Sequence, residues 1–229
     1  STTTTQAVST TTTTKETPVS TEGSQSETNS TATDATSAPT YEMIQGAGTT
    51  AIVGKQIAVN TSFDTQVAQN FGCSTADFAS HARLLLSEEI YSSLVGQSGA
   101  VLMLETRTSQ LTLQDQQISQ AISGQSSYSN YSPEGALRIY LDLSLHLINQ
   151  AQGIDTPVAM PGGEVTIDFP LPASMNDEKK YDIVVAMIDE NGTARLLDTT
   201  VKDGSLSFKT TSFSSIAVLG FERGETTAN

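Results

Sequence analysis

The chain has two histidines, and neither has the neighbours in sequence that a metal ligand or a catalytic base needs. His146 falls on the polar side of an alternating segment, and Asp142, four residues earlier, shares that side. Along a strand this separation is roughly 13 Å, which is too long for a direct contact. His81 lies in a loop or at the start of a helix. We therefore expect two exposed surface histidines, no metal site and no catalytic residue.

Other patterns that carry chemistry are missing from the sequence. It contains no G-x-S-x-G elbow of a hydrolase, and the glycines of "GAGTTAIVG" lack the Lys-Ser/Thr pair of a nucleotide-binding loop. Asp189 and Glu190 could offer oxygen ligands to Ca²⁺, but hairpin-turn chemistry explains the same residues. Cys73 is the single cysteine, which excludes an internal disulfide and a cysteine-rich zinc site. The sequence thus predicts no enzyme and no cofactor.

The segment "QSSYSNYSPEG", residues 125–135, is the candidate ligand-binding loop. Tyr128 and Tyr131 would provide contact area at a low entropic cost, which suits a glycan or protein ligand. Alternatively, both rings fold back on the core of the domain. The sequence leaves these two interpretations open.

The composition divides the chain into a polar tract and a part that can build a core. Residues 1–40 are mostly Ser and Thr, and cannot bury enough apolar surface to offset the entropy of ordering them. We expect a disordered spacer that holds a domain away from an anchor. Because the sequence begins inside this tract without Met, we also expect that a signal or lipoprotein peptide was removed.

Charge and hydropathy limit the classes of partner. Eleven basic and twenty-five acidic residues give a formal net charge of −14, which argues against a nucleic-acid partner. No apolar run in the sequence reaches membrane-spanning length.

Residues 41–136 are expected to form a β-rich part with short helices. The short apolar runs "TTAIV", "QIAVN", "ARLLL" and "AVLMLET" are strand candidates. Ser87 offers an N-cap, followed by two acidic residues and, later, a glycine stop, which predicts a short helix. One long helix over residues 76–94 is the alternative. Thr112 and Asp115 have the spacing of a capping box for a second helix.

Residues 137–229 carry the clearest periodicity. "IYLDLSLHL" alternates apolar and polar side chains over nine residues, and "EVTIDFPLP" does the same until its prolines. Asn191-Gly192 favours a hairpin with positive φ at both central residues, and Asp203-Gly204 makes the next turn. We expect an antiparallel meander packed on a second sheet.

The predicted fold class is mainly β, an antiparallel β-sandwich with one or two short helices, preceded by the Ser/Thr-rich tail. Residues 41–136 and 137–229 either pack as one unit or form two small domains.

The last strands also resemble a known module. The succession "IYLDLSLHLI", "GGEVTIDFPLP" and "KKYDIVVAMIDENGTARLLDTTVKDGSLSFKTTSFSSIAVLGF" is similar to a C-terminal β-sandwich module of secreted and cell-wall-associated proteins of Gram-positive bacteria. In that family a "DG…F.T..FS.YAV" hairpin closes the module, and "DGSLSFKTTSFSSIAVL" resembles this signature. The resemblance covers residues 80–222 and implies a spacer or part of an adhesive stalk on an exposed surface protein.

The same C-terminal segment is more distantly similar to the last strand of self-cleaving sandwich domains, such as the GAIN domains of adhesion receptors. Those domains cleave before Ser or Thr in a His-Leu-Thr or His-Phe-Ser tripeptide, with the hydroxyl as nucleophile. This chain has Ser212-Phe213-Ser214. Ser214 matches the nucleophile, but Ser212 replaces the histidine and cannot act as a base near neutral pH. The simpler interpretation is that both serines satisfy backbone groups in a turn.

These observations predict a non-catalytic extracellular bacterial surface protein, attached as a lipoprotein or through the cell wall. It would act as a structural spacer or an adhesion and interaction module. The alternatives are a glycan- or protein-binding module that uses residues 125–135 and, third, a self-processing domain. The expected partners are cell-wall glycan or another surface protein.

Overall fold

The computed structural model describes residues 42–45, 51–96, 99–128, 130–160 and 162–224. They belong to one compact unit, Ala38–Asn229. The predicted spacer, residues 1–40, lies outside the described residues. The strands are β1 (Met43–Gln45), β2 (Ala51–Val53), β3 (Gln56–Asp64), β4 (Arg83–Ser87), β5 (Val101–Thr108), β6 (Leu137–Asn149), β7 (Ile154–Pro157), β8 (Val165–Pro170), β9 (Tyr181–Ile188), β10 (Ala194–Leu196), β11 (Thr199–Lys202), β12 (Ser205–Thr210) and β13 (Ser215–Glu222). The helices are α1 (Thr65–Phe71), α2 (Thr75–His81), α3 (Glu88–Val95) and α4 (Asp115–Ser123), with short 3-10 turns η1 (Ser126–Tyr128) and η2 (Ala173–Met175).

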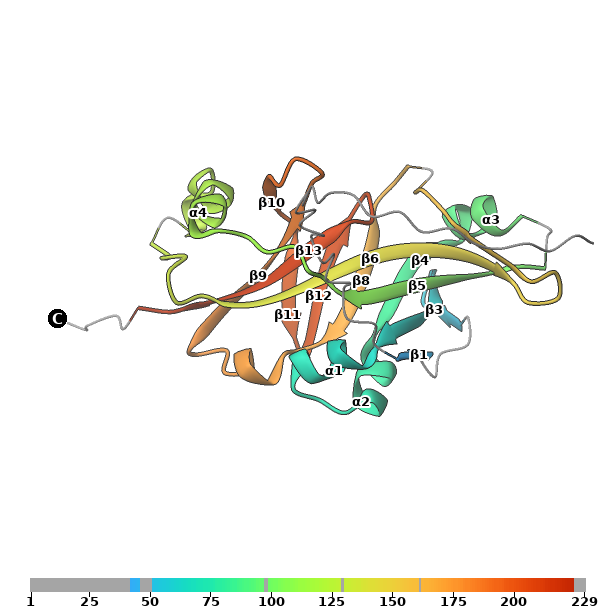
Figure 1. The fold of residues 1–229 in the computed structure, drawn as a ribbon, viewed down its shortest axis with the longest axis horizontal. Coiled ribbons are helices and arrows are strands. Elements are labelled where there is room, and N and C mark those ends of the chain that lie inside the picture. Colours follow the sequence, from blue (N-terminus) through green and yellow to red (C-terminus); the bar gives the residue numbers. More distant parts are fainter. Residues whose placement is uncertain (1–41, 46–50, 97–98, 129, 161, 225–229) are drawn as a thin grey trace, which may run out of the picture. The chain divides into compact units, whose positions relative to one another are not determined.

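The described part is mainly β, as the sequence predicts, and its strands form one large curled sheet (Figure 1). The strand order is β10-β9-β13-β6-β5-β3-β4-β8-β12-β11, with β1, β2 and β7 paired at the sides. β3 lies in the middle of this order and joins its two parts. Its residues 56–59 pair antiparallel with β4, and its residues 60–63 pair parallel with β5. We call the strands from β10 to β5 the β6 half and the strands from β4 to β11 the β8 half.

The expected closing meander is wrong in its strand pairing. β12 pairs with β8 and β11, whereas β13 pairs with β6 and β9, so the last two strands lie in different halves. The β3–β5 pair is parallel, so the sheet is not purely antiparallel. Alternation predicts which side chains point inward, but both halves bury their inward faces in the same way. The pattern therefore cannot assign a strand to one half or the other.

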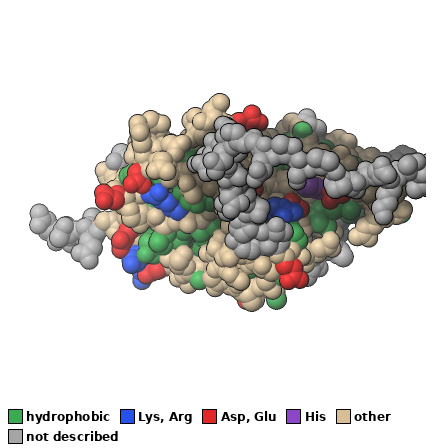
Figure 2. Space-filling model, in the orientation of Figure 1, with side chains coloured by type: hydrophobic (Ala, Val, Ile, Leu, Met, Phe, Trp, Pro, Cys, Tyr) green, Lys and Arg blue, Asp and Glu red, His purple; other side chains and the backbone are tan. Residues whose placement is uncertain are grey.

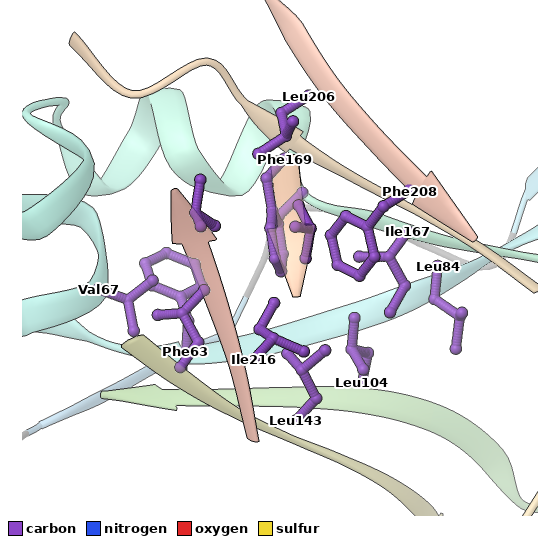
Figure 3. Packing of buried hydrophobic residues seen from close by; sticks show 14 of the residues in the cluster. Phe63, Val67, Leu84, Leu104, Leu143, Ile167, Phe169, Leu206, Phe208 and Ile216 are labelled. Carbon is purple, nitrogen blue, oxygen red and sulfur yellow. The ribbon is translucent and has the colours of Figure 1, made fainter. Parts of the chain in front are cut away.

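One hydrophobic core receives side chains from both halves (Figure 3). Leu104, Leu143 and Ile216 of the β6 half point toward Ile167 and Phe208 of the β8 half. Five phenylalanine rings form a connected chain with centroids 4.7–5.8 Å apart: Phe63, Phe71, Phe78, Phe169 and Phe208. The core thus includes residues from both 41–136 and 137–229.

The predicted helix after Ser87 is confirmed. Ser87 Oγ accepts a hydrogen bond from the Ile90 N–H at 3.2 Å, and α3 ends at Val95, before Gly96. The alternative long helix over residues 76–94 is wrong, because β4 separates α2 from α3 and its leucines are buried between neighbouring strands.

The described residues contain four α-helices rather than one or two. α1 was not predicted, and α2 overlaps the start of the long helix that was the alternative; they begin at the side-chain caps Asp64 and Ser74. The second predicted helix, α4, is present, but it begins at Asp115, two residues later than a Thr112 cap would place it. Gln114 is the N-cap residue, and its backbone N–H donates to Gln117 Oε1 at 2.8 Å.

The two predicted turns differ in geometry. Asp203 and Gly204 both have positive φ, 51° and 75°, and close a two-residue hairpin between β11 and β12. In the β9–β10 turn only Gly192 of the Asn191-Gly192 pair has positive φ. The Asp189 carboxylate accepts two backbone N–H bonds of this turn, and this side-chain capping makes the turn longer than two residues.

Candidate functional site

The outer face of β5, β6, β7 and β13 carries a group of polar side chains that we call the outer polar row. In β6, Leu143 and Leu145 are buried in the core, so Ser144 and His146 point to the opposite face of the sheet. Strand register places the other members on the same face. The outer polar row consists of Glu105, Arg107, Asp142, Ser144, His146, Asp155 and Ser215.

A chain of hydrogen bonds links three members of this row. His146 Nδ1 lies 2.7 Å from Asp155 Oδ1, and His146 Nε2 lies 3.0 Å from Ser144 Oγ. A carboxylate can only accept, so His146 Nδ1 carries the proton. In the neutral imidazole Nε2 then accepts the hydrogen bond from the Ser144 hydroxyl.

The β6–β7 hairpin brings Asp155 to His146. The register pairs Ile148 with Asp155 and His146 with Pro157, so Asp155 and His146 are diagonal neighbours on one face. Gly153 has φ 64° in the connecting turn, a conformation that favours glycine. The hairpin therefore supplies the acidic partner that Asp142, on the same strand as His146, is too far away to provide.

Two further pairs of the row flank this chain. Glu105 lies directly opposite Ser144, and the Arg107 Nε donates to Glu105 Oε1 at 2.5 Å. This hydrogen bond raises the pKa of Arg107. Asp142 lies opposite Arg107 and accepts a hydrogen bond from Ser215 Oγ at 2.5 Å. Arg107 is thus paired with the carboxylate that lies opposite Ser144.

The two histidines have different environments. His81, at the end of α2, is exposed as predicted, with Nδ1 2.9 Å from the Asp77 carbonyl oxygen. The prediction for His146 is wrong, because its side chain is only 19% exposed and both ring nitrogens have partners. The sequence contained no sign that a residue nine positions later would return to the same face.

Two hollows of the surface lie away from the Ser144–His146–Asp155 hydrogen bonds. One of about 260 Å³ is lined by Thr108, Arg138, Tyr140 and Met175, among others. Another of about 210 Å³ lies beside β9 and Arg223. Asp155 is 62% exposed, so the Ser144–His146–Asp155 chain reaches the surface of the strands rather than either hollow.

The candidate binding residues Tyr128 and Tyr131 are packed against a second hydrophobic cluster on the outer face of the β6 half. Tyr131 stacks on Phe221 with centroids 5.2 Å apart, and Tyr128 lies 5.7 Å from Tyr131. The Tyr131 hydroxyl donates to Asp182, which also accepts from Arg223. Both rings therefore lie back on the domain, and ligand binding by them stays a prediction.

Tyr131 is expected to ionise later than an ordinary tyrosine. Burial of the ring and the hydrogen bond to Asp182 raise the pKa of its hydroxyl from 10.0 to about 12. The folded state thus favours the protonated phenol, and the stability it contributes is present below pH 10 and lost as the pH rises through about 12. Ultraviolet absorbance titration of Tyr131→Phe should lack the latest step of the wild-type curve. An unchanged late step would contradict this assignment.

The serines that matched the self-cleaving domains are bonded to their surroundings. Ser214 Oγ donates to the Ile188 carbonyl oxygen at 3.1 Å, and Ser212 Oγ lies 3.2 Å from Met187 Sδ. Self-processing at Phe213-Ser214 stays a prediction, which the intact mass of the purified chain tests.

Within the described ranges, no three His, Cys, Asp or Glu side chains gather as a metal site would require. None of the helices in those ranges has the length and apolar character of a membrane span. Comparisons with protein-family models, curated proteins and solved structures gave no match to this chain. The resemblance of residues 80–222 to the Gram-positive surface module therefore stays a prediction.

Proposed function

We propose that this chain is an extracellular bacterial surface protein, attached as a lipoprotein or through the cell wall, that acts as a structural spacer or an adhesion and interaction module. Its role as spacer or interaction module requires no catalysis. The Ser/Thr-rich tract of residues 1–40 and the module-like ending of residues 203–222 support this assignment.

The observation that carries the proposal is the hydrophobic core that both halves share. A module exposed on a cell must keep its shape without a partner, and the strands of both halves bury their inward side chains in one cluster. We propose that the two halves act as the two layers of a β-sandwich across this cluster. On the face in Figure 2, acidic and basic side chains lie next to each other in small groups, which favours solubility.

Cell fractionation of the organism that makes the protein tests the location. An antibody against the chain should stain intact cells, and brief protease treatment of those cells should remove the signal. A cytoplasmic enzyme serves as the lysis control. Detection in the cytosol alone would overturn the proposal.

The alternative is a ligand-binding module that uses residues 125–135. The Tyr- and Ser-rich composition of this loop supports it. Sedimentation with purified cell-wall glycan tests this function. Glu134→Lys, at the exposed end of the loop, should abolish binding, whereas Lys55→Glu, at an exposed site elsewhere, should not. This result would favour a binding module over a spacer.

A further inference from the structure

We propose that Ser144 is a nucleophile for carboxylic esters, with His146 as its general base and Asp155 as the residue that positions the imidazole. This activity goes beyond the spacer or adhesive role and can be present or absent independently of it. Nothing in the sequence pattern suggested it, because the three residues meet only through the β6–β7 hairpin.

The distances meet the geometric requirement for an activated serine. The serine must lie within hydrogen-bond reach of the base, and the base must be oriented by a third group. The 3.0 Å separation of Ser144 Oγ and His146 Nε2 and the 2.7 Å separation of His146 Nδ1 and Asp155 Oδ1 satisfy both conditions. Such a triad is recognised by geometry and roles, and it occurs in different chain orders on unrelated folds.

The supporting structure holds these groups on regular strands. Ser144 and His146 are two residues apart on one face of β6, which pairs with β5 on one side and with β7 on the other. The leucines on either side of Ser144 are buried in the core and fix the strand against rotation. Sites on strands keep their geometry better than sites on loops.

Asp155 determines which nitrogen of His146 faces the serine. Its carboxylate accepts from Nδ1, which leaves the Nε2 lone pair directed at the Ser144 hydroxyl. Asp155 is largely exposed and takes no proton itself, so its part is to hold the tautomer and to stabilise the imidazolium that forms.

Arg107 provides a positive charge on the same face. It lies two residues along β5 from Glu105, the residue opposite Ser144, and donates to that carboxylate. A cation on this face favours negative charge that develops on a carbonyl oxygen, and its bond to Glu105 offsets the carboxylate opposite Ser144.

The reaction uses only the ester and water. Ser144 Oγ forms a bond to the ester carbonyl carbon while His146 Nε2 takes its proton, and the proton passes to the leaving alkoxide, which departs as an alcohol. Water then attacks the acyl-serine through the same base, releasing a carboxylic acid and restoring the hydroxyl. Because Asp155 is 62% exposed, an ester can approach the site from solvent.

A fluorophosphonate probe tests the nucleophile on the full chain. We expect one covalent adduct by intact mass, mapped by peptide analysis to Ser144, and slow hydrolysis of p-nitrophenyl acetate. Ser144→Ala should remove both signals. Ser123→Ala, an exposed serine at the end of α4 bonded to the Gln120 carbonyl oxygen, should leave them unchanged.

The base and the positioning residue need separate readouts. His146→Gln should slow labelling at least about 100-fold, the usual effect of removing a general base. Asp155→Asn should change the pH profile of labelling, because an amide can donate to Nδ1 and turn the protonated nitrogen toward Ser144. Thermal melting confirms that each variant is folded. No adduct at Ser144, or labelling unaffected by His146→Gln in a folded chain, would overturn the proposal.

Discussion

Replacing Phe169 with alanine is expected to lower the free energy of unfolding by about 3–5 kcal/mol. The ring is fully buried and lies 5.4–5.8 Å, centroid to centroid, from the rings of Phe71, Phe78 and Phe208. These partners come from α1, α2 and β12, so the cavity left by the substitution touches three elements that cannot move inward together.

Denaturant unfolding followed by circular dichroism measures this effect. Leu111→Ala serves as the control, because Leu111 is 42% exposed and its loss should change stability by less than about 0.5 kcal/mol. A loss of stability for Phe169→Ala as small as that of the control would contradict the position of Phe169 at the centre of the core.

Replacing Asp64 with alanine is expected to cost about 3 kcal/mol. Asp64 is only 2% exposed and caps α1, with Oδ1 2.9 Å from the Val67 N–H. It also accepts from Thr108 at the end of β5, through the backbone N–H at 2.6 Å and through Oγ1 at 3.0 Å. The substitution thus leaves three donors without their acceptor, and it removes the link between α1 and the end of β5.

Ser74→Ala is the matched control for this prediction. Ser74 Oγ accepts from the Asp77 N–H at 3.0 Å and donates to Asp77 Oδ2 at 2.6 Å, both exposed bonds within the first turn of α2, so its loss should cost about 1 kcal/mol. Equal losses for Asp64→Ala and Ser74→Ala would show that Asp64 contributes a helix cap and nothing more. Chemical denaturation of both variants under one set of conditions decides between the two results.

The sequence predicted the strands with one buried face and missed features that depend on tertiary pairing. β6 was identified correctly because its leucines alternate with polar residues along the whole strand. α1 was missed although Asp64 caps it and Gly72, at φ 68°, ends it, because the segment is only seven residues long and has no clear period. The placement of β12 and β13 in different halves depends on β3, which pairs in both, and no local pattern encodes this.

The candidate site could be predicted only in part. The alternation of β6 placed Ser144 and His146 on the outer face, as observed. The partner Asp155 belongs to β7, a four-residue strand whose side chains are all exposed, so it has no buried alternation to reveal it. For the loop of residues 125–135, composition identified Tyr128 and Tyr131 but could not decide whether their rings point outward.

The central structural claim is that residues 41–136 and 137–229 share one core and unfold together. Differential scanning calorimetry of the full chain tests it most directly, because a two-state transition requires equal calorimetric and van't Hoff enthalpies. We expect a single transition. Phe169→Ala and Leu104→Ala, substitutions in different halves, should each lower the temperature of this whole transition. Two separable transitions, with each substitution shifting only one of them, would contradict it.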